Sequence, residues 1–328
     1  MPVKKADIIV KPAKSSTRKF SRYIKPMLAT LVEEPFDDQN WIFEIKFDGY
    51  RAIAEWEQKK LKLYSRNGLS FFERYPAVAK AIMQLKHDCV LDGEIVVIDE
   101  KGRSRFQLLQ EYGEHPELSI RYFVFDLLWL NGEDIRHLPL ISRKELLQKL
   151  LSRYKGDILQ YSDHIKATGK QFFKKAVKLD MEGIIAKKSD SEYFSGTRSR
   201  EWLKIKNHNN EEAVIAGFTQ PRGSRKFFGA LILGQFKRNK LHYIGHTGTG
   251  FTQKRLKELY MQMQPLIQSD SPFAEKIKVN APVTWLRPSL VCEVKFTEQT
   301  REGILRHPVF LGLRADKSAK EVIKNNDK

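Results

Sequence analysis

Trp41-Ile42-Phe43-Glu44-Ile45-Lys46-Phe47-Asp48-Gly49-Tyr50-Arg51 is the stretch around which the rest of this sequence is organised. Apolar and polar residues alternate through it, which predicts a β-strand with one apolar face. The opposite face carries Glu44, Lys46 and Asp48, a lysine between two acids. A lysine in a strand is most often a solvated residue at a sheet edge, and this stretch alone favours that interpretation. The alternative is a nucleophilic amine that other polar residues of the chain assist.

The composition describes a large, strongly basic chain. Its 328 residues are 41% hydrophobic, which is enough for a core in one large domain or two modest ones. The net charge of +18 favours a polyanionic partner, nucleic acid first, over a merely solubilising surface. The sequence has no run of about 18 apolar residues that would predict a membrane span. Its first residues lack the apolar core of a secretory signal.

Two cysteines, Cys89 and Cys292, lie far apart in strand-like sequence. We expect both to be buried free thiols in a reducing compartment. Two cysteines are also too few for a four-cysteine zinc site.

Shifts in composition divide the chain into four parts. Residues 1–25 contain eight lysines and arginines and one aspartate, which is typical of a basic arm, although an irregular terminus without a role fits equally well. The polar run 207–210 breaks the strand pattern, so we expect a domain of residues 26–207 and a smaller one of residues 208–317. We expect residues 318–328 to form a frayed polar tail.

The periodicity of the sequence predicts an α+β fold. In the larger domain we expect strands within 41–51, 51–57, 61–66, 89–98, 122–130, 181–188 and 202–206, and helices over 74–86, after a Ser142-x-x-Glu145 capping box, and over 170–178. In the smaller domain we expect short strands at 213–219, 229–237, 240–246 and 290–296, and one helix at about 252–264. This pattern predicts a small β-barrel of the oligonucleotide-binding (OB) fold.

Six polar residues lie on predicted strands whose opposite faces are apolar: Lys46, Asp48, Glu94, Glu182, Lys204 and Lys206. If these strands form two packed sheets, their polar faces can line one cleft. A cleft that mixes lysines and carboxylates suits a metal–triphosphate ligand, because lysines neutralise phosphate oxygens and carboxylates hold Mg²⁺.

Lys46 is the candidate nucleophile of this set. An amine attacks phosphorus only when it is unprotonated, and the pKa of a free lysine is about 10.4. Nearby cations and partial desolvation would lower that pKa. Attack on an α-phosphate, with pyrophosphate leaving in line, gives a phosphoramide. Gly49 permits a tight turn beneath the nucleotide.

Each of these pieces alone has a simpler interpretation. Asp92-Gly93-Glu94 alone is typical of a turn, and Phe125 alone of a core aromatic residue. Residues 202–206 alone are an ordinary exposed strand. The combination of all of them, in order in one chain, is what favours chemistry.

That ordered set resembles the motifs of ATP-dependent DNA ligases, which are covalent nucleotidyltransferases. Its parts are Lys46-Phe47-Asp48-Gly49-Tyr50-Arg51, Ser65-Arg66-Asn67-Gly68, Leu91-Asp92-Gly93-Glu94, Phe125-Asp126-Leu127-Leu128, Glu182-Gly183-Ile184-Ile185, and Arg198 with Trp202-Leu203-Lys204-Ile205-Lys206. Residues 306–317 resemble the sixth motif, with Val309 where an arginine is more usual. Stretches 25–29, 245–251 and 305–308 are most similar to the ligase module of bacterial ligase D, the end-joining ligase. The likeness covers about residues 25–317.

The resemblance implies a nucleotidyltransferase (adenylation) domain of antiparallel sheets with flanking helices, followed by an OB-fold domain. It implies that Lys46 carries AMP and that Phe125 stacks on adenine. The other residues that it assigns to the nucleotide are Glu44, Ile45, Arg51, Arg66, Glu94, Glu182, Arg198, Lys204, Lys206, Arg306 and Lys317. It assigns Glu94 and Glu182 to the metal, Mg²⁺ or Mn²⁺, and counts Asp48, Lys204 and Lys206 with Lys46 as catalytic.

The family reaction joins a 5′-phosphate to a 3′-hydroxyl in duplex DNA. ATP first adenylates the lysine, AMP then passes to the 5′-phosphate, and the 3′-hydroxyl finally displaces AMP. The resemblance implies nicked or broken duplex DNA as the partner, with the end-binding protein Ku and a separate repair polymerase as further candidates. It also implies a monomer in the bacterial cytoplasm, at the nucleoid. Basic loop residues of the smaller domain would follow the DNA backbone: Arg222, Arg225, Lys226, Lys237 and Arg238.

Three alternatives stay open at this point. An RNA ligase or a capping guanylyltransferase would share the same chemistry, although the length of the smaller domain argues against both. A non-catalytic DNA-end-binding protein built on an inactive ligase is the third, although every residue that such a protein would lose is present. An NAD-dependent ligase is excluded because it needs the four-cysteine zinc site.

Overall fold

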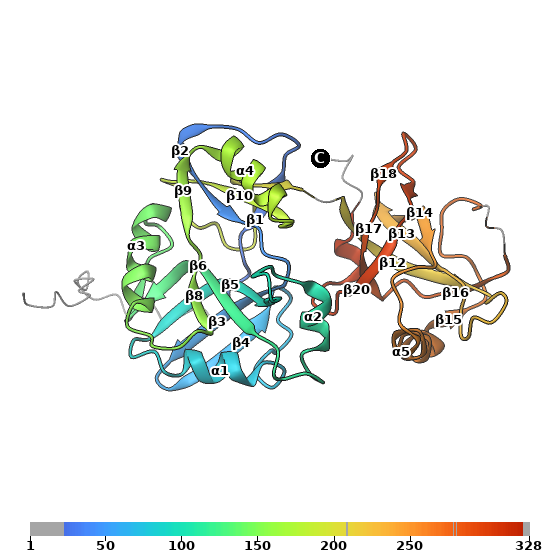
Figure 1. Cartoon of the computed structure of the whole chain (residues 1–328), viewed down its shortest axis with the longest axis horizontal. Coiled ribbons are helices and arrows are strands. Elements are labelled where there is room, and N and C mark those ends of the chain that lie inside the picture. The colour runs from blue at the N-terminus through green and yellow to red at the C-terminus, as the bar shows by residue number, and fades with distance from the viewer. Residues whose placement is uncertain (1–22, 208, 278, 280, 324–328) are drawn as a thin grey trace, which may run out of the picture. The chain divides into compact units, whose positions relative to one another are not determined.

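The computed structural model describes residues 23–323 except 208, 278 and 280. The chain divides after Asn207 into two compact units, and each is described by itself (Figure 1). Of the predicted basic arm, residues 1–22 lie outside the described residues. None of the helices that the structure describes is long and apolar enough to cross a lipid bilayer.

A five-stranded sheet in the first unit carries the segment that leads to Lys46. Its strands run in the order β1 (Leu28–Leu31), β11 (Arg198–Lys206), β10 (Gly183–Lys188), β2 (Asp38–Ile45) and β9 (His164–Ala167). β1 and β11 are parallel, and the other neighbours are antiparallel. One face of β2 and β10 packs on helix α4 (Gly169–Lys178), through Phe43 and Ala176 among others. The other face of this sheet is therefore the one that can carry a site.

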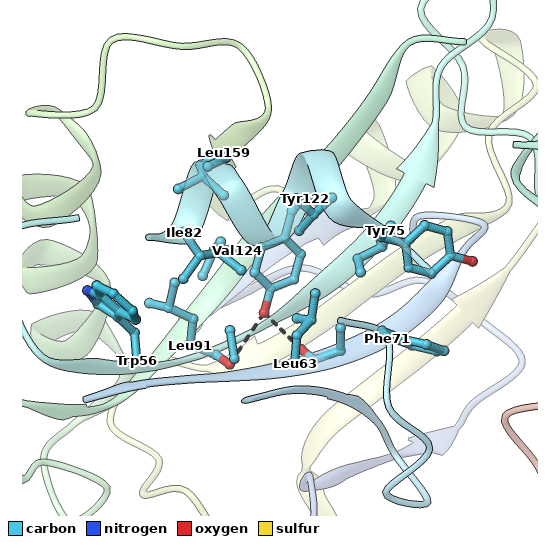
Figure 2. Packing of buried hydrophobic residues seen from close by; sticks show 14 of the residues in the cluster. Trp56, Leu63, Phe71, Tyr75, Ile82, Leu91, Tyr122, Val124 and Leu159 are labelled. Atoms are coloured by element: carbon cyan, nitrogen blue, oxygen red, sulfur yellow. Dashed lines mark hydrogen bonds between the residues drawn. The ribbon is translucent and has the colours of Figure 1, made fainter. Parts of the chain in front are cut away.

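A six-stranded sheet forms the other layer of the first unit. Its strands run in the order β4 (Lys60–Ser65), β3 (Tyr50–Glu57), β5 (Cys89–Val97), β6 (Ile120–Leu130) and β7 (Glu133–Asp134), and β8 (Leu159–Tyr161) pairs in parallel with β6. The main core packs between this sheet and helix α1 (Pro76–Ile82), as Figure 2 shows. Within it the Tyr122 hydroxyl donates to the carbonyl oxygens of Ala52 (2.9 Å) and Leu91 (3.4 Å), which satisfies a buried polar atom.

The stretch from Trp41 to Arg51 is not one strand. β2 ends at Ile45, and the chain turns through residues 46–49 before β3 begins at Tyr50. The prediction of a continuous strand was wrong because β2 and β3 belong to different sheets, so the chain must change direction between them. Gly49 makes this possible, since a Cβ there would lie 2.2 Å from the carbonyl oxygen of Ile95 on β5.

The helices of the first unit differ from prediction at their ends. α1 is shorter than the expected 74–86, and α4 agrees with the expected 170–178 to within one residue. α2 (Phe106–Glu111) was not predicted. α3 (Leu140–Leu151) begins after Pro139, so Ser142 lies inside it and the predicted capping box is wrong. Proline is well suited to a helix start because its φ is already fixed.

The second unit contains the predicted short strands. A seven-stranded sheet contains β14 (Lys240–Thr247), β13 (Leu231–Lys237), β12 (Asn210–Thr219), β16 (Val283–Leu286) and β15 (Ile267–Gln268) in that order, with β17 (Val291–Lys295) joining β12 to β20 (Val309–Leu313). β18 (Glu298–Gln299) and β19 (Leu305–Arg306) form a separate pair. The predicted helix is α5 (Gln253–Met263), which begins where Thr252 Oγ1 accepts from the Arg255 amide at 3.2 Å.

The start of the predicted polar tail is folded. A short 3-10 helix spans Ala319–Glu321, and Ser318 caps it. Ala319 and Val322 are buried, and the Val322 carbonyl accepts from the Phe236 amide at 2.8 Å. The expectation of fraying was therefore wrong for residues 318–323, because two apolar side chains among polar ones are enough to fix the segment on the sheet. Residues 324–328 lie outside the described residues.

Candidate nucleotide-binding site

A pocket with an empty volume of about 540 Å³, open to solvent at its mouth, lies between the two sheets of the first unit. Both sheets contribute to it, as the polar strand faces predicted. Its walls are formed by Ala29, Glu44, Ile45, Lys46, Phe47, Arg51, Glu94, Phe125, Ile185, Lys187 and Trp202. It therefore combines aromatic rings, cations and carboxylates, which is the lining that a nucleotide requires.

Lys46 is the first residue after β2, at the edge of this pocket. Its backbone amide donates to the Gly183 carbonyl at 3.0 Å, and its ammonium group forms an ion pair with Glu182. The Lys46 side chain keeps 19% of its surface exposed, so a ligand in the pocket can reach the amine. A lysine that is held by a carboxylate and still partly exposed is suited to nucleophilic attack once it loses its proton.

Asp48 is held by the loop that follows β5. Its amide donates to Ser104 Oγ at 3.0 Å, and its Oδ2 accepts from the Phe106 amide at 3.2 Å. These contacts fix the turn that carries Lys46. Asp48 does not line the pocket described above.

Glu44 is a buried anion between two buried cations. Its Oε1 accepts from Lys144 Nζ at 2.6 Å and its Oε2 from Lys187 Nζ at 2.8 Å. Lys144 also donates to the Ser162 carbonyl at 2.9 Å. Burial by itself raises the pKa of Glu44, but the two ammonium groups outweigh it, so that pKa lies below its usual value. Glu44 is thus held as a carboxylate on the pocket wall.

Lys187 also contacts the aromatic wall. Its ammonium lies 4.2 Å from the ring centroids of Phe125 and of Trp202, which is the range of a cation–π interaction. Burial, with the charge of Lys144, lowers the pKa of Lys187 to about 8, although Glu44 acts in the opposite direction. One side chain therefore joins the carboxylate and the aromatic part of the pocket.

Sequence analysis did not single out Lys144 or Lys187 as site residues. Lys144 belongs to the buried face of α3, together with Leu140, Arg143 and Leu147. A cation at a core position of an amphipathic helix is costly unless it is paired. The spacing of these residues in the sequence is the signal that could have found Lys144.

Arg51 is fixed against the pocket wall by Asp92. Its Nε and Nη2 donate to the two oxygens of Asp92 at 2.9 and 2.6 Å, and Asp92 also accepts from the Tyr193 hydroxyl at 2.7 Å. Burial alone lowers the pKa of Arg51, but the Asp92 carboxylate reverses the effect and raises it. The guanidinium carbon lies 5.3 Å from the centroid of Phe125. Asp92 thus has the partner that an acid inside an apolar strand needs.

Of the other predicted site residues in this unit, Glu94 lines the pocket, whereas Arg66, Glu182, Arg198, Lys204 and Lys206 do not. Lys204 and Lys206 on β11 stand in register with Ile185 and Gly183 on β10. Burial, together with the charge of Arg66, lowers the pKa of Arg198. Glu182 meets the site through its ion pair with Lys46, and Glu94 lines the wall directly.

The second unit holds the remaining predicted residues. Arg306 pairs with Glu298 at 2.8 Å on an exposed hairpin, and Lys317 forms an ion pair with Glu212. Arg225, expected on a DNA-facing loop, instead donates to the carbonyls of Phe228 (2.8 Å) and Gly248 (2.6 Å). These contacts direct the guanidinium toward its own unit, and contact of Arg225 with DNA stays a prediction.

Comparison with known families decides what kind of site this is. Residues 26–206 match the model of the "ATP dependent DNA ligase domain", and residues 224–317 match the "ATP dependent DNA ligase C terminal region". The chain belongs to the ATP-dependent DNA ligase family.

Two relatives of this chain are named as end-joining proteins. The chain is 40% identical over 307 residues to the multifunctional non-homologous end joining protein LigD of Pseudomonas aeruginosa. The matched region covers 92% of this chain and 36% of that protein. The chain is 37% identical over 303 residues to LigD of Mycolicibacterium smegmatis, covering 91% of this chain and 39% of that one. The chain thus spans less than half the length of these curated relatives.

Two solved structures resemble the ligase over nearly its whole length. One is a mycobacterial DNA ligase D complexed with ATP and MES, at 33% identity and a TM-score of 0.68, covering 92% of this chain and 98% of that one. The other is the ligase domain of LigD from M. tuberculosis, at 32% identity and a TM-score of 0.52, with the same coverage. The predicted combination of an adenylation domain and an OB-fold domain is therefore confirmed.

The described part of the ligase contains no group of three or more histidine, cysteine, aspartate or glutamate side chains that could hold a metal ion. Mg²⁺ in phosphate-transfer sites typically binds one or two carboxylates and takes its other ligands from substrate phosphates and water. Glu94 on the pocket wall and Glu182 beside Lys46 are the carboxylates predicted for such a role.

Proposed function

We propose that this ligase seals 5′-phosphate/3′-hydroxyl breaks in duplex DNA through AMP linked covalently to Lys46, as part of end-joining repair. The observation that carries this proposal is the position of the Lys46 amine, beside Glu182 and at the edge of an aromatic and cationic pocket, in a chain of this family. The relative whose structure contains ATP supports ATP as the nucleotide.

The pocket suggests a division of roles. Phe125, with Lys187 beside its ring, provides a surface on which the adenine base can stack. Glu44 is ionised, so it can accept hydrogen bonds but cannot donate them. Ile45 completes the pocket wall next to Lys46. Glu94 and the fixed guanidinium of Arg51 suit the ribose and the nearby phosphate.

The first step makes one bond and breaks another. Lys46 Nζ attacks the α-phosphorus of ATP, an N–P bond forms, and the bond to the pyrophosphate oxygen breaks as pyrophosphate leaves. Lys46 must give up a proton to attack, and the carboxylate of Glu182 is placed to accept it. Lys204, Lys206 and Arg198 are the cations that would neutralise charge on the phosphate oxygens.

The later steps use the same centre. The 5′-phosphate of the DNA takes AMP from Lys46, and the 3′-hydroxyl then forms the phosphodiester bond as AMP leaves. Asp48, fixed by the Ser104–Phe106 segment, belongs to this stage. A divalent ion, Mg²⁺ or Mn²⁺, held by Glu94 and Glu182 together with phosphate oxygens, would supply Lewis-acid stabilisation.

DNA binding would be largely electrostatic. The net charge of +18 favours contact with the phosphate backbone, so affinity should fall steeply with salt. Arg306 and Lys317 of the second unit remain candidates for phosphate contacts in the adenylation step.

The end-joining role rests on the relatives. Proteins named for non-homologous end joining match the chain at 37% and 40% identity. We therefore propose the end-binding protein Ku and a repair polymerase as partners, and the bacterial cytoplasm, at the nucleoid, as the place of action. We also propose that the ligase works as a monomer.

The test is a labelling experiment. The full chain is incubated with α-labelled ATP or GTP and Mg²⁺, and labelled protein is measured; a nicked DNA duplex or a nicked RNA duplex is then added to chase the label. We expect ATP-specific labelling that Lys46→Ala abolishes and the exposed control Lys59→Ala preserves, followed by sealing of DNA. Labelling from GTP, or sealing of RNA alone, would favour the other transferases. DNA binding without any label would favour an end-binding protein.

A further inference from the structure

One loop of the first unit gathers two arginines and two aspartates. Asp99 Oδ2 accepts from Arg103 Nε at 2.9 Å and from Arg105 Nε at 3.3 Å. The same arginines reach Asp180 Oδ2, Arg105 through Nη2 at 2.7 Å and Arg103 through Nη1 at 3.3 Å. We name this cluster the arginine clasp; it consists of Asp99, Arg103, Arg105 and Asp180. It joins the loop after β5, in the six-stranded sheet, to the turn before β10, in the five-stranded sheet.

The segment that carries the two arginines of the clasp is bonded to residues close in sequence to both members of the Lys46–Glu182 ion pair. Asp180 comes two residues before Glu182. On the other side, Ser104 and Phe106, which alternate with the two arginines, hold Asp48 through bonds of 3.0 and 3.2 Å, and Asp48 comes two residues after Lys46. A single segment of four residues, 103–106, is thus tied to both backbones that carry the ion pair.

The backbone conformation of Asp180 is one that these hydrogen bonds can stabilise. Asp180 has φ of 54°, in the left-handed region that costs a non-glycine residue energy. It lies two residues beyond the end of α4, and its amide donates to the Val177 carbonyl at 3.0 Å. The two arginines add charge-assisted hydrogen bonds to the side chain of this residue. The conformation that delivers Glu182 to the pocket therefore depends on contacts from the opposite sheet.

The far end of the clasp is itself well fixed. Asp99 Oδ1 accepts from the amides of Lys101 and Arg103, each at 2.9 Å. Although burial opposes the effect, these amides and the arginines lower the pKa of Asp99 to about 2. Asp99 therefore stays charged, and it holds both guanidinium groups in an orientation that faces Asp180.

We propose that Arg105, assisted by Arg103, is a positioning residue for lysine adenylation, which sets the separation of Lys46 from Glu182 by holding Asp180. This inference rests on the proposed function and adds a residue that does not line the nucleotide pocket. Arg105 acts on the geometry of the nucleophile and its proton acceptor and leaves nucleotide binding to the pocket walls. A small displacement of such groups is costly, since misplacement by about 1 Å can slow an enzyme about 100-fold.

The experiment measures single-turnover formation of lysyl-AMP against ATP concentration in the full chain. The variants are Arg105→Met, Asp180→Asn, their combination, and Arg105→Lys. We expect each of the first two to lower the limiting rate at least about tenfold while the half-saturating ATP concentration stays within about twofold. The double variant should be no slower than the slower of the two single variants, because both substitutions remove the same contact between Arg105 and Asp180. Arg105→Lys, which keeps a cation opposite Asp180, should recover part of the rate.

The matched control is Arg136→Met. Arg136 pairs with Asp134 at 2.6 Å and is exposed to nearly the same extent, 30% against 31% for Arg105. It also donates to Ser195 Oγ at 2.8 Å, so its side-chain partners lie outside the turn that carries Lys46. We expect its limiting rate to stay within about twofold of the wild type, as for an ordinary exposed ion pair. Thermal unfolding of all variants is followed in parallel.

Three results would overturn the proposal. The first is a limiting rate that is unchanged in Arg105→Met and Asp180→Asn. The second is a limiting rate that falls equally in Arg136→Met. The third is a double variant whose loss of rate is the product of the two single losses, together with an Arg105→Lys variant that recovers none of the rate. If Arg105→Met unfolds, the milder Asp180→Asn, which keeps the shape of the side chain, decides alone. A wild-type chain that forms no lysyl-AMP would instead reject the proposed function, so the two failures are distinct.

Discussion

Lys187 Nζ donates a hydrogen bond of 2.8 Å to Glu44 Oε2, and both side chains are almost fully buried on the wall of the nucleotide pocket. The same ammonium lies 4.2 Å from the ring centroid of Phe125. A single cation thus fixes the pocket carboxylate and the aromatic surface with respect to each other. We therefore expect affinity for the nucleotide to depend on the positive charge of Lys187, a residue that the sequence did not identify as part of the site.

Replacing Lys187 with methionine should weaken ATP binding. The change keeps most of the unbranched apolar stem but removes the ammonium group. It therefore leaves Glu44 with only Lys144 as a cationic partner and removes the cation beside Phe125. We expect the half-saturating ATP concentration for lysyl-AMP formation to rise about tenfold, equivalent to about 1.4 kcal/mol. The neighbouring, partly exposed Lys188, replaced by methionine, is the control and should stay within about twofold. Equal behaviour of the two variants would show that the buried cation does not support the pocket.

The lowered pKa of Lys187 predicts how stability depends on pH. In the folded chain Lys187 loses its proton near pH 8, whereas the unfolded chain keeps it up to the usual lysine value of 10.5. Between these values the unfolded state binds more protons, so stability rises with pH by up to about 1.4 kcal/mol per pH unit from this group. Below pH 8 the group is charged in both states and contributes no slope.

Urea unfolding of wild type and Lys187→Met from pH 7 to pH 10.5 isolates this contribution. The free energy of unfolding of the wild type should grow relative to that of the variant above pH 8. A constant difference between the two proteins over this range would contradict the assignment of a lowered pKa to Lys187.

Arg143 should matter for stability more than any exposed cation of its helix. Its Nε and Nη2 donate to Asp126 at 2.8 and 2.9 Å, and both side chains are fully buried. Arg143→Met would leave the Asp126 carboxylate buried without its cation, which typically costs about 3–5 kcal/mol. The exposed Lys149 on the same helix, replaced by methionine, should change stability by less than about 0.5 kcal/mol.

The double variant Arg143→Met with Asp126→Leu completes that experiment. It removes both charges, so it should be more stable than Arg143→Met alone. Chemical denaturation of the four proteins measures these differences. A double variant that is less stable than Arg143→Met would mean that Asp126 stabilises the fold through contacts other than Arg143, such as the hydrogen bond that it accepts from the Leu127 amide at 2.9 Å.

The sequence predicted the site wherever the information was local. Alternation placed Glu44, Glu94, Lys204 and Lys206 on polar strand faces, and the structure brings these strands into two facing sheets. Alternation also continued through residues 46–49, so the turn after Ile45 was missed. A periodic pattern cannot show that a chain leaves one sheet for another, because an apolar residue in the turn can be buried as well as one in a strand. Phe47 is such a residue: its ring stacks on that of Phe123, with 4.0 Å between the ring centroids.

The buried ion pairs could not be predicted because their partners are far apart in the chain. Lys144 and Lys187 stand 100 and 143 residues from Glu44, and Arg105 stands 75 residues from Asp180. A single sequence shows that a charge lies at a core position, but only the fold shows which opposite charge meets it. The acceptors of Arg225 could not be predicted for the same reason, because they are backbone carbonyls, which every residue offers.

Arg225 and Lys226, neighbours on one loop of the second unit, should respond to mutation in opposite ways. Arg225 donates to two backbone carbonyls, and its guanidinium lies 5.6 Å from the ring centroid of Phe251. Lys226 is exposed. Arg225→Ala should therefore lower the stability of the chain by about 1–2 kcal/mol, through lost packing and hydrogen bonds.

Lys226→Ala should leave the thermal unfolding temperature unchanged and weaken DNA binding instead. If Lys226 contacts one phosphate, the slope of log affinity against log salt should fall by about one. Binding to a nicked duplex at several salt concentrations, with thermal unfolding measured in parallel, separates the two effects. The reverse pattern, a stable Arg225→Ala chain with a reduced salt slope, would show that the loop turns Arg225 outward on DNA, as its place in a basic stretch of sequence first indicated.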